Sequence, residues 1–333
     1  MEKIVDNNTP LSVSFEITWR CNLSCLHCYQ FQSSNQELTT PEIKDILDQL
    51  ADAGAFYLSF TGGEPLMRED FWEIAEYARY KTFSIMLQTN GSLITHKDAK
   101  NIHRLNFSEV RISLLGATES IHDGITRVEG SFKRVIEAIR LLKEESVRVI
   151  FATTLMRENA FEYRQFRDLA DRLGVILITS PVVYPKNNGD NGPIGHRLTE
   201  AEIKQVYSYY FEWDPEMQKQ FCIERKGLLC GFGRIACSIN PKGELYPCVA
   251  LPLAAGSLRM TPFKDIWSKS EILNRIRAIQ EQDLGDCYGC SLSLSCFRCS
   301  AMSYFEKGEI TAVPEECCRI TKTLKEVRDA KEA

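Results

Sequence analysis

Three cysteines lie close together near the start of the chain, at Cys21, Cys25 and Cys28. Their spacing is C-x3-C-x2-C, and no other cysteine occurs before Cys222. Three thiolates from one short loop can hold three irons of a cubane cluster and leave the fourth iron open to a substrate or cofactor. The alternative is a structural zinc site completed by His27 or a distant residue, although closed zinc sites usually pair two local ligands with two distant ones.

Ten further cysteines lie between Cys222 and Cys318, so a body with few cysteines is followed by a cysteine-dense tail. Residues 238–248 predict two short strands joined by a turn at Asn240–Gly243. The tail has four cysteines in the spacing C-x2-C-x5-C-x2-C, which taken alone also suits a zinc ribbon. These four are Cys287, Cys290, Cys296 and Cys299, and Cys230, Cys237 and Cys248 flank the predicted hairpin.

The composition is that of an ordinary soluble protein. The chain has 333 residues, 44% of them hydrophobic and 26% charged, with a net charge of −5. This balance gives no basic footprint for nucleic acid, and no apolar run is long enough to span a membrane. The first residues lack a signal peptide, so we expect a cytosolic protein whose cysteines are used for metal or redox chemistry.

The body of the chain alternates strand patterns with helix patterns. Residues 11–18 alternate apolar and polar side chains, as a strand with one buried face does. Residues 40–54 carry a helical pattern, with Pro41 suited to its first turn and Gly54 to its end. Five more strand and helix pairs follow. Six such units predict an α/β fold with a parallel sheet and outer helices.

Ligands of such folds bind where the strands end. The unusual residues of this chain follow the first four predicted strands, so we expect them to meet at one mouth. They are the three cysteines, Thr61–Pro65 (TGGEP), Gln88–Gly91 (QTNG) and Ser113–Gly116 (SLLG).

Together these motifs resemble the radical S-adenosylmethionine (radical SAM) enzymes, and the resemblance covers nearly the whole chain. It implies a partial (β/α)6 TIM-like barrel in which Cys21, Cys25 and Cys28 hold a [4Fe-4S] cluster. In that family S-adenosylmethionine binds the open iron and is cleaved to methionine and a 5′-deoxyadenosyl radical, which abstracts hydrogen from a substrate.

The resemblance also implies contacts to S-adenosylmethionine. Tyr29 is the aromatic residue that usually follows the last cysteine, Ser113 matches a ribose contact, and Arg127 matches a partner of the methionine carboxylate. A guanidinium suits that role because its planar fork matches a carboxylate. The remaining expected contacts are Gly62, Gly63, Glu64 and Pro65 of the glycine-rich motif, and Asn90, which either borders the adenosine or closes a turn.

The tail resembles the SPASM extension of these enzymes, which carries two auxiliary [4Fe-4S] clusters. One spacer has two residues where the family has three, which affects the ligation of Cys299. We expect a core over 1–200, a helical linker over 201–229 and the auxiliary cluster domain over 230–333, with Cys222 as a spare buried thiol. The resemblance assigns Cys230, Cys237, Cys248 and Cys299 to one cluster, and Cys287, Cys290, Cys296 and Cys317 (or Cys318) to the other.

The resemblance favours a peptide or protein substrate, as in the maturation of ribosomally made peptides. Val249 follows Cys248 where sulfatase-maturing relatives place Asp, so that activity is disfavoured, and no catalytic acid or base is identified. We expect an electron donor such as flavodoxin or ferredoxin. Because few residues precede the first strand, we expect leader recognition to come from a separate protein or from direct docking of the substrate. The alternatives are modification of tetrapyrrole side chains and a non-enzymatic iron–sulfur or zinc scaffold.

Overall fold

The computed structural model describes residues 8–31, 36–213 and 230–332. Its first strand, β1 (Ser12–Thr18), lies inside a nine-stranded sheet. Val13, Phe15 and Ile17 are fully buried in the hydrophobic core. Because side chains alternate along a strand, Ser14 and Glu16 face the other side of the sheet. The alternation in the sequence therefore sets which face of β1 packs against the outer helices.

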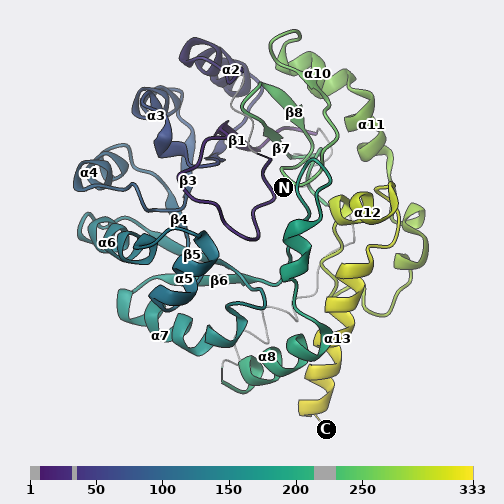
Figure 1. Cartoon of the computed structure of the whole chain (residues 1–333). Helices are drawn as coiled ribbons and strands as arrows, with labels where there is room; N and C mark the ends of the chain where they lie inside the picture. Colours follow the sequence, from purple (N-terminus) through teal and green to yellow (C-terminus); the bar gives the residue numbers. More distant parts are fainter. Residues whose placement is uncertain (1–7, 32–35, 214–229, 333) are drawn as a thin grey trace.

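Six parallel strands form the barrel-like body in the order β6-β5-β4-β3-β2-β1, which confirms the expected α/β fold. Helices α2, α3, α4, α6 and α7 form an arc outside these strands (Figure 1). The strands are β2 (Tyr57–Gly62), β3 (Ser84–Thr89), β4 (Glu109–Ser113), β5 (Val149–Thr154) and β6 (Ile176–Ser180). The helices are α2 (Thr40–Asp52), α3 (Phe71–Tyr80), α4 (His96–Arg104), α6 (Ser131–Glu144), α7 (Tyr163–Leu173) and α8 (Glu200–Trp213).

Helix α5 (Glu119–Thr126) was not expected from the sequence. The segment contains Gly124, which weakens helix propensity, and only a few apolar residues. Its helical form depends on packing, since Ile125 and His122 are both about 1% exposed. None of the helices in the described ranges is long and apolar enough to cross a membrane.

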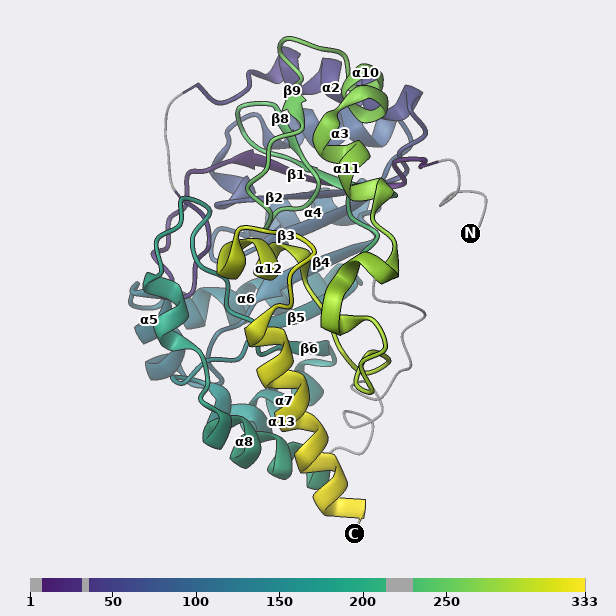
Figure 2. The same ribbon diagram turned by 90° about the vertical axis from the view of Figure 1, so that its right-hand side faces the viewer.

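The cysteine-rich tail joins the same sheet. Strand β7 (Ala236–Ile239) pairs in parallel with β1, on the side opposite β2. The predicted hairpin is confirmed, because β7 pairs antiparallel with β8 (Glu244–Tyr246), and β9 (Gly256–Ser257) follows. The tail helices are α10 (Phe263–Lys269), α11 (Glu271–Ala278), α12 (Ser300–Lys307) and α13 (Glu315–Glu332). Helix α13 packs along α8 (Figure 2), so the tail closes the open side of the body. The domain boundaries at residues 200 and 230 stay predictions.

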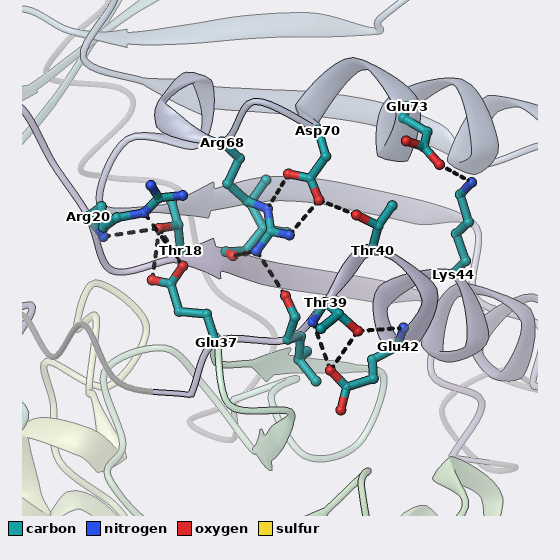
Figure 3. Close-up of polar contacts among 12 residues, drawn as sticks. Thr18, Arg20, Glu37, Thr39, Thr40, Glu42, Lys44, Arg68, Asp70 and Glu73 are labelled. Atoms are coloured by element: carbon teal, nitrogen blue, oxygen red, sulfur yellow. Dashed lines mark hydrogen bonds and ion pairs between the residues drawn. The ribbon is translucent and has the colours of Figure 1, made fainter.

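A buried arginine anchors the end of β1, where the first cysteine loop begins. Arg68 is 7% exposed and donates hydrogen bonds to the carbonyls of Ile17, at 3.0 Å, and Leu38, at 3.1 Å. It also binds both carboxylate oxygens of Asp70, at 2.9 and 2.6 Å (Figure 3). One side chain thus connects β1, the residue before the capping box of α2, and the start of α3.

Glu37 holds the first residues of the loop from the other side. Its Oε1 accepts hydrogen bonds from the backbone N–H of Trp19, at 2.7 Å, and the hydroxyl of Thr18, at 2.8 Å, and Arg20 lies 3.7 Å from Oε2 (Figure 3). The backbone that leads into the first cysteine is therefore held by two side chains from different segments, Arg68 and Glu37.

Replacing Arg68 by Met should lower the free energy of unfolding by about 3 kcal/mol, because it leaves two carbonyls and a partly buried carboxylate without their partner. Chemical denaturation of the anaerobic protein measures this. Arg104→Met is the matched control, since both side chains of the Arg104–Glu76 pair are more than half exposed, at 55% and 52%, and such pairs contribute about 0–1 kcal/mol. Equal effects of the two substitutions would show that Arg68 is not an anchor.

Candidate functional site

The first three cysteines line one cavity of about 610 Å³ at the C-terminal ends of the strands. Cys21, Cys25 and Cys28 are all partly buried in the loop after β1. Burial, together with the nearby thiols of Cys28 and Cys21, raises the pKa of Cys25 to about 12, so the three thiols lie within electrostatic reach of one another. A bound iron cation would lower these pKa values, because a cysteine that binds a metal is deprotonated.

The arrangement of these thiols suits a cluster better than a single ion. In the described part of the chain, no three His, Cys, Asp or Glu side chains are placed to hold one metal ion together. A cubane has a different requirement, because each thiolate binds its own iron. The donor set of Cys21, Cys25 and Cys28 therefore fits a [4Fe-4S] cluster with one open iron.

The two glycines after β2 are required by the backbone of the cysteine loop. A Cβ on Gly62 would lie 2.3 Å from the carbonyl oxygen of Thr18, and one on Gly63 would lie 2.3 Å from that of Arg20. Gly62 also has a φ of +129°, which disfavours other residues. The amide of Gly63 donates to Thr18 and that of Glu64 donates to Arg20, both at 2.8 Å. The glycines thus let the two strand ends meet beside the cavity.

Glu64 is placed behind the cavity wall and joins the ends of β2 and β3. It is fully buried and accepts hydrogen bonds from the amide of Asn90 at 2.8 Å and the hydroxyl of Thr89 at 2.8 and 2.9 Å. Burial raises the pKa of Glu64 to about 7, while the bonds from Asn90, Thr89 and Leu66 lower it. Pro65 is buried at the start of a 3-10 turn and does not line the cavity either. We assign both residues a supporting role.

The other expected cofactor contacts do meet at the cavity. Asn90 lies with its side-chain amide 3.8 Å from the sulfur of Cys21. Arg127 has a left-handed backbone (φ 58°), and no carboxylate of the described residues pairs with it. Its guanidinium is therefore available to an anionic ligand. The expected residues that line the cavity are Tyr29, Gly62, Gly63, Asn90, Ser113 and Arg127.

Two histidines also line this cavity and were not among the expected contacts. His27 lies between two of the cysteines, and its Nδ1 is buried without a hydrogen-bond partner in the described structure. Burial, together with the nearby His196, lowers the pKa of His27 to about 4. His196 bonds through Nδ1 to Glu158. The position of His27 inside the cysteine motif could have indicated that it lines the cavity. His196 lies far along the sequence, and no motif around it indicates this.

Three tail cysteines line a second cavity of about 220 Å³, namely Cys230, Cys248 and Cys299. Cys237 does not join them. It lies on β7 opposite Val13 of β1, is fully buried, and packs in the hydrophobic core. The parallel pairing of β7 with β1 points Cys237 toward the core and Ser238 toward the interior. The structure thus places Cys237 apart from the other three, and their grouping as ligands of one cluster stays a prediction.

The last pair of cysteines divides between two neighbourhoods. Burial raises the pKa of Cys318, and the thiols of Cys296, Cys287 and Cys290 raise it further. Cys317 is fully buried, and the thiol that acts on it most is Cys299. Cys318 thus lies within electrostatic reach of Cys287, Cys290 and Cys296, whereas Cys317, which the sequence favoured, lies near Cys299 and Cys296. Which of the two completes the set stays a prediction. Cys222 lies outside the described residues.

Known proteins resemble this chain in both parts. The family model of the Radical SAM superfamily matches residues 15–170, and that of the SPASM iron-sulfur cluster-binding domain matches residues 230–291. The chain is 28% identical to an AdoMet-dependent heme synthase of Methanosarcina barkeri, over 92% of this chain and 95% of that protein. It is 30% identical to the mycofactocin maturase MftC of Mycobacterium tuberculosis, over 93% of this chain and 83% of that protein.

A solved structure also shares the fold. The structure of Streptococcus suis SuiB bound to its precursor peptide SuiA aligns with a TM-score of 0.74. The two chains are 16% identical, and the alignment covers 95% of this chain and 78% of SuiB. At this identity the likeness concerns the fold.

Arg127→Met should weaken binding of S-adenosylmethionine by about ten- to a hundredfold, because a charge-assisted bond to a carboxylate contributes on the order of 1.5–3 kcal/mol. Arg127→Lys should be intermediate, since it keeps the charge but loses the fork. Equilibrium binding to the reconstituted protein measures the effect, with iron content expected to stay at the parent level. Unchanged affinity in Arg127→Met would mean that this guanidinium faces solvent instead of the cofactor.

Proposed function

The chain belongs to the radical SAM superfamily and carries a SPASM iron-sulfur cluster-binding domain, and on this basis we propose that it modifies a peptide. It is therefore an enzyme that uses S-adenosylmethionine and [4Fe-4S] clusters, and the scaffold interpretation is set aside. When bound, the cluster and S-adenosylmethionine supply a carbon radical that removes a hydrogen atom from the substrate. The residues of the chain bind and orient the groups around that event.

The observation that carries the peptide proposal is a third cavity, of about 240 Å³, beside the cofactor cavity. The two cavities share Trp19 and Phe31 in their walls. The smaller cavity is lined by both parts of the chain, with Glu16 on the barrel side and Val249 on the tail side. A side chain inserted here would lie next to the cofactor and next to Cys248, which adjoins Val249.

The polar groups of this cavity suit a side chain that ends in a hydrogen-bond donor. Glu16 is 5% exposed, and both hydrogen bonds that it accepts from described residues, from Gln30 and Tyr29, reach Oε1. None of the described residues donates a hydrogen bond to Oε2, and Glu16 lines the cavity. The side-chain oxygen of Asn187, another wall residue, is buried without a described partner. Unpaired buried acceptors favour a ligand that donates to them.

Glu16 is also suited to exchange a proton with the substrate. Burial raises the pKa of Glu16 to about 7, while the bonds from Gln30 and Tyr29 lower it. A carboxyl group with a pKa near the operating pH can act as acid or base. We propose Glu16 as the residue that holds a donor group of the peptide beside the reacting atoms.

Modification of a tetrapyrrole is the second candidate, because the heme synthase relative is matched over 95% of its length. The size of the third cavity favours a peptide side chain. Pockets for drug-sized ligands have roughly 300–1,000 Å³, and the third cavity alone, at about 240 Å³, is below that range. SuiB bound to a precursor peptide serves as an example that this fold can hold a peptide.

The proposal includes two partners: an electron donor such as flavodoxin or ferredoxin, and a separate protein that binds the leader of the peptide.

The proposal predicts that reconstituted enzyme with S-adenosylmethionine and a reductant changes the mass of a precursor peptide encoded by a neighbouring gene. Fe-coproporphyrin should stay unchanged in a parallel reaction, and mass spectrometry follows both. Turnover of the porphyrin with an unaltered peptide would favour the second candidate.

Glu16→Gln should lower the kcat/KM for the peptide about ten- to a hundredfold with unchanged cofactor affinity, whereas Glu119→Gln on α5 should change neither.

A further inference from the structure

A tyrosine from the barrel side reaches the second cavity, where three tail cysteines meet. Tyr184 follows β6 by four residues, and its hydroxyl lies 3.4 Å from the sulfur of Cys299. Among the described residues that line this cavity, Tyr184 alone precedes residue 230. Its ring packs against a small apolar cluster formed by Ala250, Leu251, Ala301 and Ile310. The hydroxyl is thus held at the sulfur by packing on the tail.

The direction of this hydrogen bond follows from the state of the sulfur. A cysteine that binds iron is a thiolate without a proton, so it can only accept. The phenol of tyrosine keeps its proton near neutral pH and can donate. If Cys299 is a ligand, Tyr184 must therefore be the donor. Hydrogen bonds to the sulfurs of an iron–sulfur cluster are one of the means by which a protein sets the reduction potential.

We propose that Tyr184 raises the reduction potential of the auxiliary cluster held by Cys230, Cys248 and Cys299. The reduced cluster carries one more negative charge than the oxidised cluster, so its sulfur ligands accept a hydrogen bond more strongly. The bond from Tyr184 therefore stabilises the reduced state more and eases the uptake of one electron from the donor. This inference rests on the proposed function, because it requires that these three cysteines bind a cluster.

The position of Tyr184 distinguishes it from the other described groups that donate to sulfurs of the tail cysteines, because those groups come from the tail itself. The amide of Ala250 lies 3.4 Å from the sulfur of Cys248, the amide of Leu292 lies 3.4 Å from that of Cys290, and the hydroxyl of Thr321 lies 3.6 Å from that of Cys296. Tyr184 belongs to the segment that also supplies Lys186 to the cofactor cavity and Asn187 to the third cavity. The donor to Cys299 therefore comes from the segment of the barrel that also lines the cofactor cavity and the third cavity.

The test is a redox titration of the reconstituted holoenzyme followed by electron paramagnetic resonance. Tyr184→Phe keeps the ring and removes the hydroxyl. At a fixed potential, the ratio of reduced to oxidised auxiliary cluster should fall about three- to tenfold, which is roughly 28–59 mV for one electron. Tyr304→Phe is the matched control, since Tyr304 packs on the same apolar cluster and none of its described contacts is a hydrogen bond to sulfur. It should leave the potential unchanged.

Two outcomes would overturn the inference, and they differ from each other. An unchanged potential in Tyr184→Phe, or an equal shift in Tyr304→Phe, with full iron content, would show that Tyr184 only packs. The combined variant Cys230→Ala, Cys248→Ala, Cys299→Ala identifies the signal, because it should lose about four irons per chain. If that variant keeps its iron and all of its paramagnetic resonance signals, these three cysteines do not bind a cluster. The proposal then fails at the cluster assignment, whatever Tyr184 does.

Discussion

The junction between β1 and β2 is the constraint on which the site depends. The carbonyls of Thr18 and Arg20 accept hydrogen bonds from the amides of Gly63 and Glu64, and a side chain at either glycine would collide with those carbonyls. This contact fixes where the backbone leaves β1 and hence where the first three cysteines lie. Glu64 extends the junction to β3 through Thr89 and Asn90. The glycine-rich motif is therefore needed for the shape of the cysteine loop as well as for room beside a ligand.

The pairing of β7 with β1 brings the rest of the chemistry to the same place. One strand, β1, ends in the cysteine loop and is paired over Ser12–Phe15 with strand β7 of the tail. Its inward-facing Glu16 therefore meets the tail residues Ser238 and Tyr246 in the wall of the third cavity. From the other end of the sheet, residues 184–187 reach all three cavities. A substrate placed between barrel and tail is thus close to the cofactor and to an auxiliary cysteine set at once.

Local patterns predicted the body of the fold and the cysteine loop, because both depend on short stretches of sequence. The six strands follow from alternation and the outer helices from helical periodicity, and the C-x3-C-x2-C spacing lies within one loop. The features that local patterns did not predict depend on contacts between distant segments. Whether Cys237 faces the core is set by the pairing of a four-residue strand with β1, and a shift of one residue would reverse it.

The adjacent cysteines of α13 illustrate the same limit. Cys317 and Cys318 are equivalent by spacing, yet successive helical residues point about 100° apart, so the rotation of α13 against the tail decides which thiol lies near Cys287 and Cys290. His196 had no local signal because it comes from a segment after β6. Glu16 was visible only as a polar position in a strand, and its burial beside a cavity emerges when the tail packs on β1.

The central claim is that Cys21, Cys25 and Cys28 hold the cluster at which S-adenosylmethionine is cleaved. The most direct measurement is the iron content and the formation of 5′-deoxyadenosine after all three are replaced by Ala. The account predicts a loss of about four irons per chain, retention of the iron bound by the tail, and no cleavage of S-adenosylmethionine. An unchanged iron content in this variant, or stoichiometric zinc in the native protein, would contradict it.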